Sequence, residues 1–394
     1  MNNKASSILQ NAMALLLTAS AALCLCLLTG CSHEELPETE KYNTMIVLRG
    51  DGTKALDPDE AQSIVIYAFS HNTNDLVGYL YEATINGRDI FPMNLTAGGK
   101  IDFYVILNPV CSGFEIIDEN NKAVTFGSHE GKTPETIKNW KLRRATDGTP
   151  GKAVPMSNLE EQVDDDHNPT GKSNRTFEVV ANRNSWQEIP IQVTRAVSKV
   201  EVWFWANDNL PEYGGSYQND NHYSSIDTMT LKDPVVRAEL MEGQNSSNAE
   251  DYIEENEATT IKNTDGYDGF NDRFKPYDSG IFYSDIYFRK IWEQYILPNT
   301  FFGGSNVGEI GGADADNLKL KCTSLNVKYT EHYYQNWSGW KETPQTPKDI
   351  YLPISPRNTI IKVWCALNDD TDRSFTYTVV DWDGPVTVNV PDFD

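Results

Sequence analysis

The hydrophobic and polar positions of this 394-residue chain alternate in short runs that are typical of β-strands. The first run is 44–48, and 63–69 follows as a fully apolar run rich in Val and Ile. A third run, 76–85, ends at Asn86-Gly87, which predicts a hairpin turn. A second hairpin is expected between 93–96 and 101–107.

One helix is expected in the first half of the chain. Thr133 is a suitable cap, and Pro134 suits the first helical turn. Ile137 and Trp140 then fall on one face at helical spacing.

Strand-like runs separated by Gly, Pro and Asn continue to the end of the chain, at 177–181, 188–194, 195–205, 281–288, 295–298, 318–329, 350–354, 359–367, 374–382 and 385–390. Many short strands of this kind predict an all-β chain built from sandwiches. The strong alternation that begins at Arg195 predicts a domain boundary. We therefore expect an N-terminal β-sandwich domain at 44–194, which holds the minor helix, and a C-terminal β-sandwich domain at 195–394.

The chain begins with an uncharged apolar run, 11–28, after a single basic residue, which is typical of a secretory signal. The run ends at Leu28-Thr29-Gly30-Cys31, which has the layout of a bacterial lipobox. We expect 1–30 to be a lipoprotein signal peptide and Cys31 to be the lipidated residue, with palmitate as one acyl chain. The alternative is an ordinary signal peptide followed by a chance cysteine. The polar, acidic stretch 31–43 is typical of a flexible tether.

The formal net charge of -24 is spread along the chain and argues against nucleic acid and anionic membrane surfaces as partners. Of the six cysteines, two lie in the signal peptide and one is Cys31, which leaves Cys111, Cys322 and Cys365. An odd number permits at most one internal bridge. All three lie in or beside strand-like runs, so we expect them to be core thiols.

The sequence motifs of common enzymes are incomplete in this chain. The stretch 127–133 has the residue types of a phosphate loop but one residue too few between its glycines, and the acidic cluster 164–167 lacks the glycine and glutamate of a calcium loop. Neither a helical histidine pair nor a Gly-x-Ser-x-Gly elbow occurs. We expect a protein that is not an enzyme and uses no cofactor or metal. A hydrolase whose carboxylate pair meets only in space is an alternative.

Aromatic residues gather at 333–340 and include Trp337 and Trp340. Exposed aromatic faces stack on sugar rings, so a surface glycan-binding lipoprotein is another alternative, with these two residues as glycan contacts. Packing between loops explains such a cluster equally well.

Several stretches together resemble the fimbrillins, the type V pilins of Bacteroidales. Their pattern of lipobox, acidic tether, first strand, basic residue and second strand is similar to Cys31, 45–48, Lys54 and 64–69 in this chain. Further similar motifs are Arg195-Ala196 before an alternating strand, 295–299, Arg357-Asn358 and 380–382.

The resemblance implies two transthyretin-like β-sandwich domains in tandem and a lipid-anchored precursor of a fimbrial subunit. In the family a protease removes the first strand after a basic residue, and a strand from a neighbouring subunit fills the groove by β-strand addition. Here it implies cleavage at Lys54 or Arg49. It also favours 385–390, with Val386, Val388 and Val390 on one face, as the donor strand, for which a simple edge strand is the alternative.

The partners implied are other fimbrial subunits, a processing protease, the outer membrane through the lipid, and a host or bacterial surface receptor. The implied location is the outer membrane, the cell surface and the fimbrium, with a role in cell adhesion. The family's major pilins are cut after arginine, whereas the aligned residue here is Lys54. An uncleaved anchor or accessory subunit is therefore also an alternative.

Overall fold

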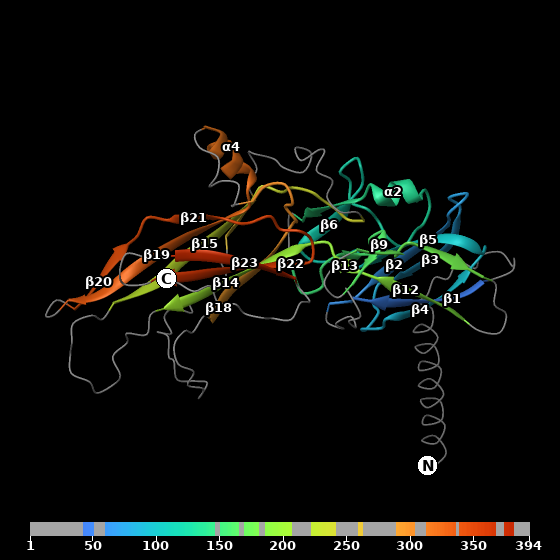
Figure 1. The fold of residues 1–394 in the computed structure, drawn as a ribbon, viewed down its shortest axis with the longest axis horizontal. Helices are drawn as coiled ribbons and strands as arrows, with labels where there is room; N and C mark the ends of the chain where they lie inside the picture. Colours follow the sequence, from blue (N-terminus) through green and yellow to red (C-terminus); the bar gives the residue numbers. More distant parts are fainter. Residues whose placement is uncertain are drawn as a thin grey trace, which may run out of the picture. The chain divides into compact units, whose positions relative to one another are not determined.

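The computed structural model describes residues 42–50, 60–145, 150–164, 169–180, 186–206, 222–241, 259–262, 289–303, 313–335, 339–367 and 374–381. These residues form an all-β fold, as the sequence predicts, with short helices α2 (Pro134–Lys138) and α4 (Ala313–Lys321) beside the sheets (Figure 1). The expected lipidation residue, donor strand and most of the polar stretch 207–278 lie outside the described residues.

Two sheets face each other in the first half of the fold. The smaller has the strand order β12-β1-β4, formed by Gln187–Gln192, Tyr42–Arg49 and Ile90–Leu95. The larger has the order β13-β8-β5-β2-β3, formed by Thr194–Arg195, Met156–Ser157, Gly99–Leu107, Ile64–Ser70 and Leu76–Glu82. Strand β11 (Thr176–Val179) adds to β5, and β9 (Glu161–Val163) pairs with β10 (Pro169–Ser173) beside them.

Strand β2 is buried on both of its faces. Ile64 and Ile66 belong to the core between the two sheets, whereas Val65 and Tyr67 belong to a second core on the opposite face of β2. This double burial explains why the run is apolar at every position rather than at every second one.

A third layer covers the second core. It consists of α2 and a sheet with the order β16-β7-β6, formed by Ala238–Glu239, Lys141–Arg144 and Phe114–Ile117. Helix α2 forms as predicted: the Thr133 hydroxyl accepts the N–H of Thr136, and Pro134 lies in the first turn. Ile137 and Trp140 are fully buried, and the Trp140 ring packs edge-on against Tyr67 at 5.9 Å between centroids.

Two further sheets pack around a third core in the second half. One has the order β18-β14-β22-β23, formed by Arg289–Ile296, Ser198–Ala206, Thr359–Leu367 and Ser374–Asp381. The other has the order β17-β15-β19-β20, with β21 also paired to β19, and is formed by Thr259–Lys262, His222–Asp233, Ser324–Gln335, Gly339–Pro344 and Lys348–Tyr351. Val200 and Val363 from the first sheet meet Leu231 and Val327 from the second in this core.

Hydrogen bonds from two arginines connect the two halves close to Arg195. The domain boundary expected at this residue stays a prediction. Arg195 donates to the Asn358 side chain at 3.1 Å and pairs with Glu60. Arg357 donates to the carbonyls of Arg195, Leu240 and Thr194 at 3.1, 3.0 and 2.7 Å. Arg195, Arg357 and Asn358, which belong to two of the motifs in the family resemblance, therefore contact one another.

Three local predictions are wrong. Strand β4 pairs with β1 rather than with β3 or β5, so neither Asn86-Gly87 nor 97–100 closes a hairpin. Asn86 and Gly87 do adopt positive φ values of 50° and 72°, but their turn carries the chain from one sheet to the other. The expected strand 318–329 begins only at Ser324, because the residues before it form α4 in the second half.

We predict that Arg357→Lys lowers the free energy of unfolding by about 2–4 kcal/mol, because a lysine cannot keep the forked set of hydrogen bonds. Urea denaturation measures the loss. Arg143→Lys is the matched control: Arg143 pairs with Glu115 at 2.6 Å on the surface, with 37% of its side chain exposed, and should change stability by less than about 1 kcal/mol. Equal losses in both variants would contradict the assigned role.

We also predict that Glu201→Gln lowers Tm at pH 7 by roughly 2–4 °C. Burial raises the pKa of Glu201, but Lys199 at 2.8 Å, the charge of Lys290 and the Trp203 N–H outweigh it, so the net pKa lies below its ordinary value of 4.5. A lowered carboxyl pKa adds stability above the unfolded pKa and loses it as the pH falls through the folded pKa.

Thermal melts from pH 7 downward should therefore show the gap between wild type and Glu201→Gln closing below about pH 4.5. The control is Glu293→Gln, because Glu293 also pairs with Lys290 but is 46% exposed. A gap that widens in acid would contradict the assignment.

Candidate functional site: the first strand and its groove

Strand β1 is the central strand of the smaller sheet. It pairs in parallel with β12, Thr44 opposite Gln187, and antiparallel with β4, Thr44 opposite Met93. The N–H of Leu48 donates to the carbonyl of Asp89 at 2.8 Å on the β4 side. On the β12 side, the carbonyl of Arg49 accepts the N–H of Val193, the residue that follows β12, at 2.9 Å. The backbone of β1 is thus bonded on both sides.

The side chains of β1 alternate between the core and the outside. Thr44 and Ile46 are 0% exposed and Leu48 is 2% exposed, whereas Met45 and Val47 are half-buried. This period of two places one row of side chains between the sheets. Ile46 and Leu48 belong to the same core as the β4 and β12 residues Phe91, Met93, Leu95, Ile189 and Ile191. Strand β1 therefore occupies a groove between β4 and β12 that has an apolar floor.

The predicted cleavage residues flank this strand. Arg49 is the last residue of β1 and is exposed, while Lys54 lies outside the described residues. If β1 left the sheet, the inner edges of β4 and β12 would each lose a ladder of backbone partners. The strand-removal hypothesis requires this placement of β1.

The outer edges of the same sheet carry one proline each, Pro92 in β4 and Pro190 in β12. Pro92 stands opposite Met45 and Pro190 opposite Val47. In antiparallel pairs bonded residues alternate, and the Leu48–Asp89 bond places Pro92 at a position whose nitrogen faces away from β1.

The bond from Val193 to Arg49 fixes the parallel ladder in the same way and places the Pro190 nitrogen on the outer side. Each outer edge therefore lacks an N–H that an added strand would need, while the inner edges keep theirs. Neither proline is among the site residues that the sequence motifs indicate. The signal exists in the sequence, because a proline inside a strand-like run indicates an edge strand.

Most other predicted site residues cannot be placed. Cys31, Trp337, Val386, Val388 and Val390 lie outside the described residues. Trp340 lies in β20 opposite Tyr334 of β19, but the structure does not describe its side chain, so the glycan-contact prediction stays a prediction.

The three body cysteines are free thiols. Cys322 and Cys365 are buried, and Cys111 is half-buried. Burial raises the pKa of Cys111 and of Cys322 to about 11, although a hydrogen bond with the Phe114 backbone acts to lower that of Cys111. Burial also raises the pKa of Cys365. These thiols stay protonated at neutral pH, which agrees with a role in core packing.

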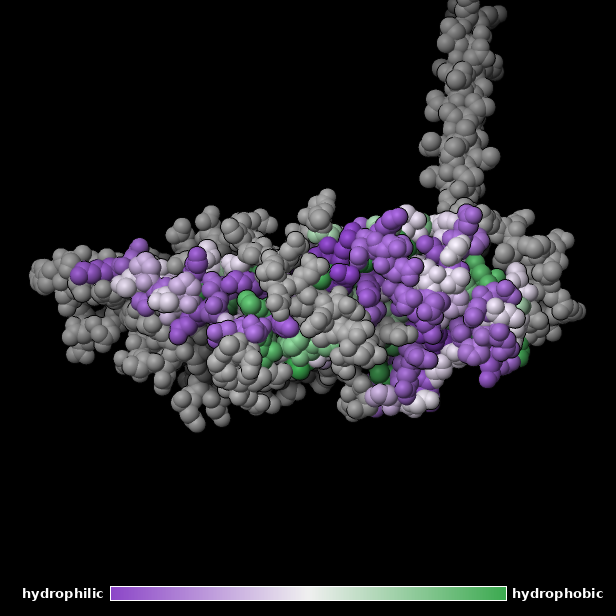
Figure 2. All heavy atoms as spheres, turned by 90° about the horizontal axis from the view of Figure 1, so that it is seen from above, coloured by the Kyte–Doolittle hydropathy of each residue, from purple (hydrophilic) through white to green (hydrophobic). Residues whose placement is uncertain are grey.

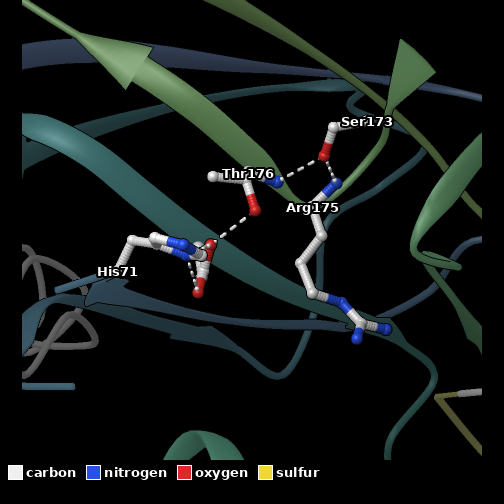
Figure 3. Close-up of polar contacts among 5 residues, drawn as sticks. His71, Ser173, Arg175 and Thr176 are labelled. Atoms are coloured by element: carbon white, nitrogen blue, oxygen red, sulfur yellow. Dashed lines mark hydrogen bonds and ion pairs between the residues drawn. The ribbon is translucent and has the colours of Figure 1, made fainter. Parts of the chain in front are cut away.

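One polar cluster has residue types used in acid–base chemistry (Figure 3). The His71 ring nitrogen Nδ1 lies 3.0 and 2.9 Å from the two carboxylate oxygens of Asp102, and the Thr176 hydroxyl donates to the same carboxylate at 2.6 Å. Because the hydroxyl is bound to Asp102 rather than to His71, the base does not activate it as a nucleophile. The cluster instead ties β11 to β5 and to the residue that follows β2.

The described residues contain neither a metal-ion cluster nor a membrane-spanning helix. No group of three His, Cys, Asp or Glu side chains in the placed part of the chain is arranged to hold a metal ion. None of the helices described is long and apolar enough to cross a membrane.

Among the described residues visible in Figure 2, hydrophilic ones predominate, with small hydrophobic areas between them. Large exposed apolar side chains in the described part include Ile90 and Trp186, which are both 41% exposed. Ile90 stands opposite Val47, and Trp186 immediately precedes the residue opposite Thr44. Apolar side chains therefore lie near both ends of the groove.

Comparison with known proteins gives matches among solved structures only. No protein-family model and no curated protein matches the chain. The chain is similar to a "putative cell adhesion protein" from Bacteroides eggerthii, with 15% identity, a TM-score of 0.45, and 87% of this chain and 97% of that one covered.

It is also similar to the tip fimbrial protein Mfa3 from Porphyromonas gingivalis, with 13% identity, a TM-score of 0.38, and 86% and 100% of the two chains covered. A fimbrial assembly protein from Parabacteroides distasonis matches with 8% identity, a TM-score of 0.35, and 86% and 96% covered. These names fall in the class that the sequence motifs resemble. At such identities and TM-scores the likeness carries no argument about function.

We predict that Ile46→Ala lowers the free energy of unfolding by about 2–4 kcal/mol, because it leaves a cavity under the central strand. Hydrogen exchange should speed up together in β1, β4 and β12, since the three strands share one ladder. Val47→Ala, on the outward face of β1, is the control and should have a smaller effect. Faster exchange limited to β1 would argue against a shared groove.

Proposed function

We propose that this chain is the lipid-anchored precursor of a fimbrial subunit that polymerises by strand exchange and serves adhesion at the cell surface. The observation that carries the proposal is the position of β1, which is central in its sheet, buried along one face and first among the described strands. A strand in this position holds two other strands together, yet it can leave without breaking a connection between later elements.

Removal of β1 would open a groove that strongly favours a new strand. The inner N–H and C=O groups of β4 and β12 would lose their partners, and an unsatisfied buried backbone group costs about as much as a lost hydrogen bond. The apolar floor, which includes Phe91 and Ile189, would face water. A strand from another subunit restores both the ladder and the burial.

The donor would be the C-terminal run of a second copy. In an extended strand Val386, Val388 and Val390 fall on one face, as Thr44, Ile46 and Leu48 do in β1. The prolines on the outer edges of β4 and β12 support the groove as the place where a donor strand adds, because those outer edges accept a further strand poorly.

Cleavage would also release the body from the membrane. The proposed lipid on Cys31 precedes β1, and both candidate cleavage residues, Arg49 and Lys54, follow the core of the strand. One cut would therefore remove the anchor and the plug strand together. Without the cut, the chain would remain an outer-membrane anchor or accessory subunit.

We predict that limited digestion of the purified mature chain with a trypsin-like protease produces a ladder of oligomers that resists mild detergent. Native gels show the ladder, and mass spectrometry identifies the cut. The double variant Arg49→Gln and Lys54→Gln should stay intact in this segment and monomeric under the same conditions. The two single variants show which bond is used.

Deletion of 384–394 supplies the second arm of the test. This variant should be cut normally but should not extend a ladder, because it has a groove and no donor. A wild-type chain that is cut after Arg49 or Lys54, loses β1 and remains monomeric would overturn the proposal.

A further inference from the structure

The central strand contains one polar side chain that its groove does not satisfy. Thr44 is 0% exposed, and its hydroxyl Oγ1 has no hydrogen-bond partner among the residues that the structure describes. It lies on the same face of β1 as Ile46 and Leu48, so its side chain belongs to the row between the sheets.

The residues beside Thr44 explain why its hydroxyl is unsatisfied. Met93, opposite on β4, belongs to the apolar core. Gln187, opposite on β12, directs its amide toward the backbone of 178–180: its oxygen accepts the N–H of Val180 at 3.0 Å, and its nitrogen donates to the carbonyl of Glu178 at 2.7 Å. The socket around Thr44 therefore suits an aliphatic side chain.

Valine has nearly the same shape as threonine and carries no hydroxyl. Burying a hydroxyl without a hydrogen bond disfavours the bound state by an amount that corresponds to about tenfold or more in an equilibrium constant. A strand with valine at this position would bind the groove more tightly than β1 with Thr44.

We propose that Thr44 makes the resident strand the weaker of two occupants, so that an incoming strand with an aliphatic side chain in this socket displaces it. The inference rests on the proposed function and identifies the occupant as the C-terminal run of a second copy. In an extended strand Val386, Val388 and Val390 fall on one face, and that face carries no polar residue. Thr387 and Asn389 fall on the opposite face. The groove would therefore bind a strand with an aliphatic side chain at the Thr44 position more tightly than it binds β1.

The test uses full-length mature protein, cut by a trypsin-like protease, and a synthetic peptide of residues 384–391 as competitor. Size-exclusion chromatography with mass spectrometry measures the rate at which the fragment containing β1 leaves the body. Thr44→Val should slow release about tenfold, since affinity changes within one interface lie mostly in the dissociation rate. It should also raise the Tm of the uncut chain.

Val47→Thr is the matched control, because it makes the same isosteric exchange in reverse on the half-buried outward face of β1. It should change the release rate by no more than about twofold. Ile46→Thr places a second hydroxyl in the core row and should speed release.

The outcomes separate this inference from the proposed function. If the peptide displaces wild-type β1 and Thr44→Val leaves release and Tm unchanged or lowers Tm, the inference about Thr44 is wrong, while strand exchange stands. If neither the peptide nor other subunits ever displace β1 after cleavage, strand exchange itself fails. A rise in Tm with slower release supports the inference.

Discussion

The backbone of β1 is the contact on which the smaller sheet depends. A strand buried within a protein must find partners for the N–H and C=O groups on both of its sides, and β1 meets this need for β4 and β12 at once. The parallel pair with β12 joins residues about 140 positions apart, as in Thr44 and Gln187. No short turn holds this pair together. The sheet exists only while some strand fills its centre, and that requirement links the fold to the proposed assembly.

The second constraint is the arginine junction between the halves. Arg195 and Asn358 are 163 positions apart, yet their side chains are hydrogen-bonded, and Arg357 donates to carbonyls on two neighbouring segments. Arg175 likewise donates to the carbonyl of Met241. Arg195 and Arg357, which come from the short motifs that resemble those of fimbrillins, therefore lie where segments distant in the sequence meet, and Arg357 supplies strong donors to backbone carbonyls there. These hydrogen bonds connect segments of the two halves that are far apart in the sequence.

Local patterns predicted the elements well and their pairing poorly. The apolar run of β2 and the helix at Thr133 follow from composition and capping, which act over a few residues. Partners of β1 and β4 depend on which faces become buried, and no local signal reports that. Hence Asn86-Gly87 predicted a hairpin although its strands enter different sheets. Thr44 could not be recognised either, since an unsatisfied hydroxyl is a property of the groove and not of a threonine in an alternating run.

Pro92 and Pro190 have a consequence for aggregation of the subunit along its outer strand edges. If β1 is removed as proposed, the subunit would expose strand edges and would be prone to stack side by side into amyloid-like ribbons. Each outer strand, however, lacks an outward N–H at one position, so a foreign segment laid along it meets a gap in its ladder. Growth from such a subunit would then be linear rather than sheet-like, and the order of a fibre would be protected by two residues that take no part in holding it together.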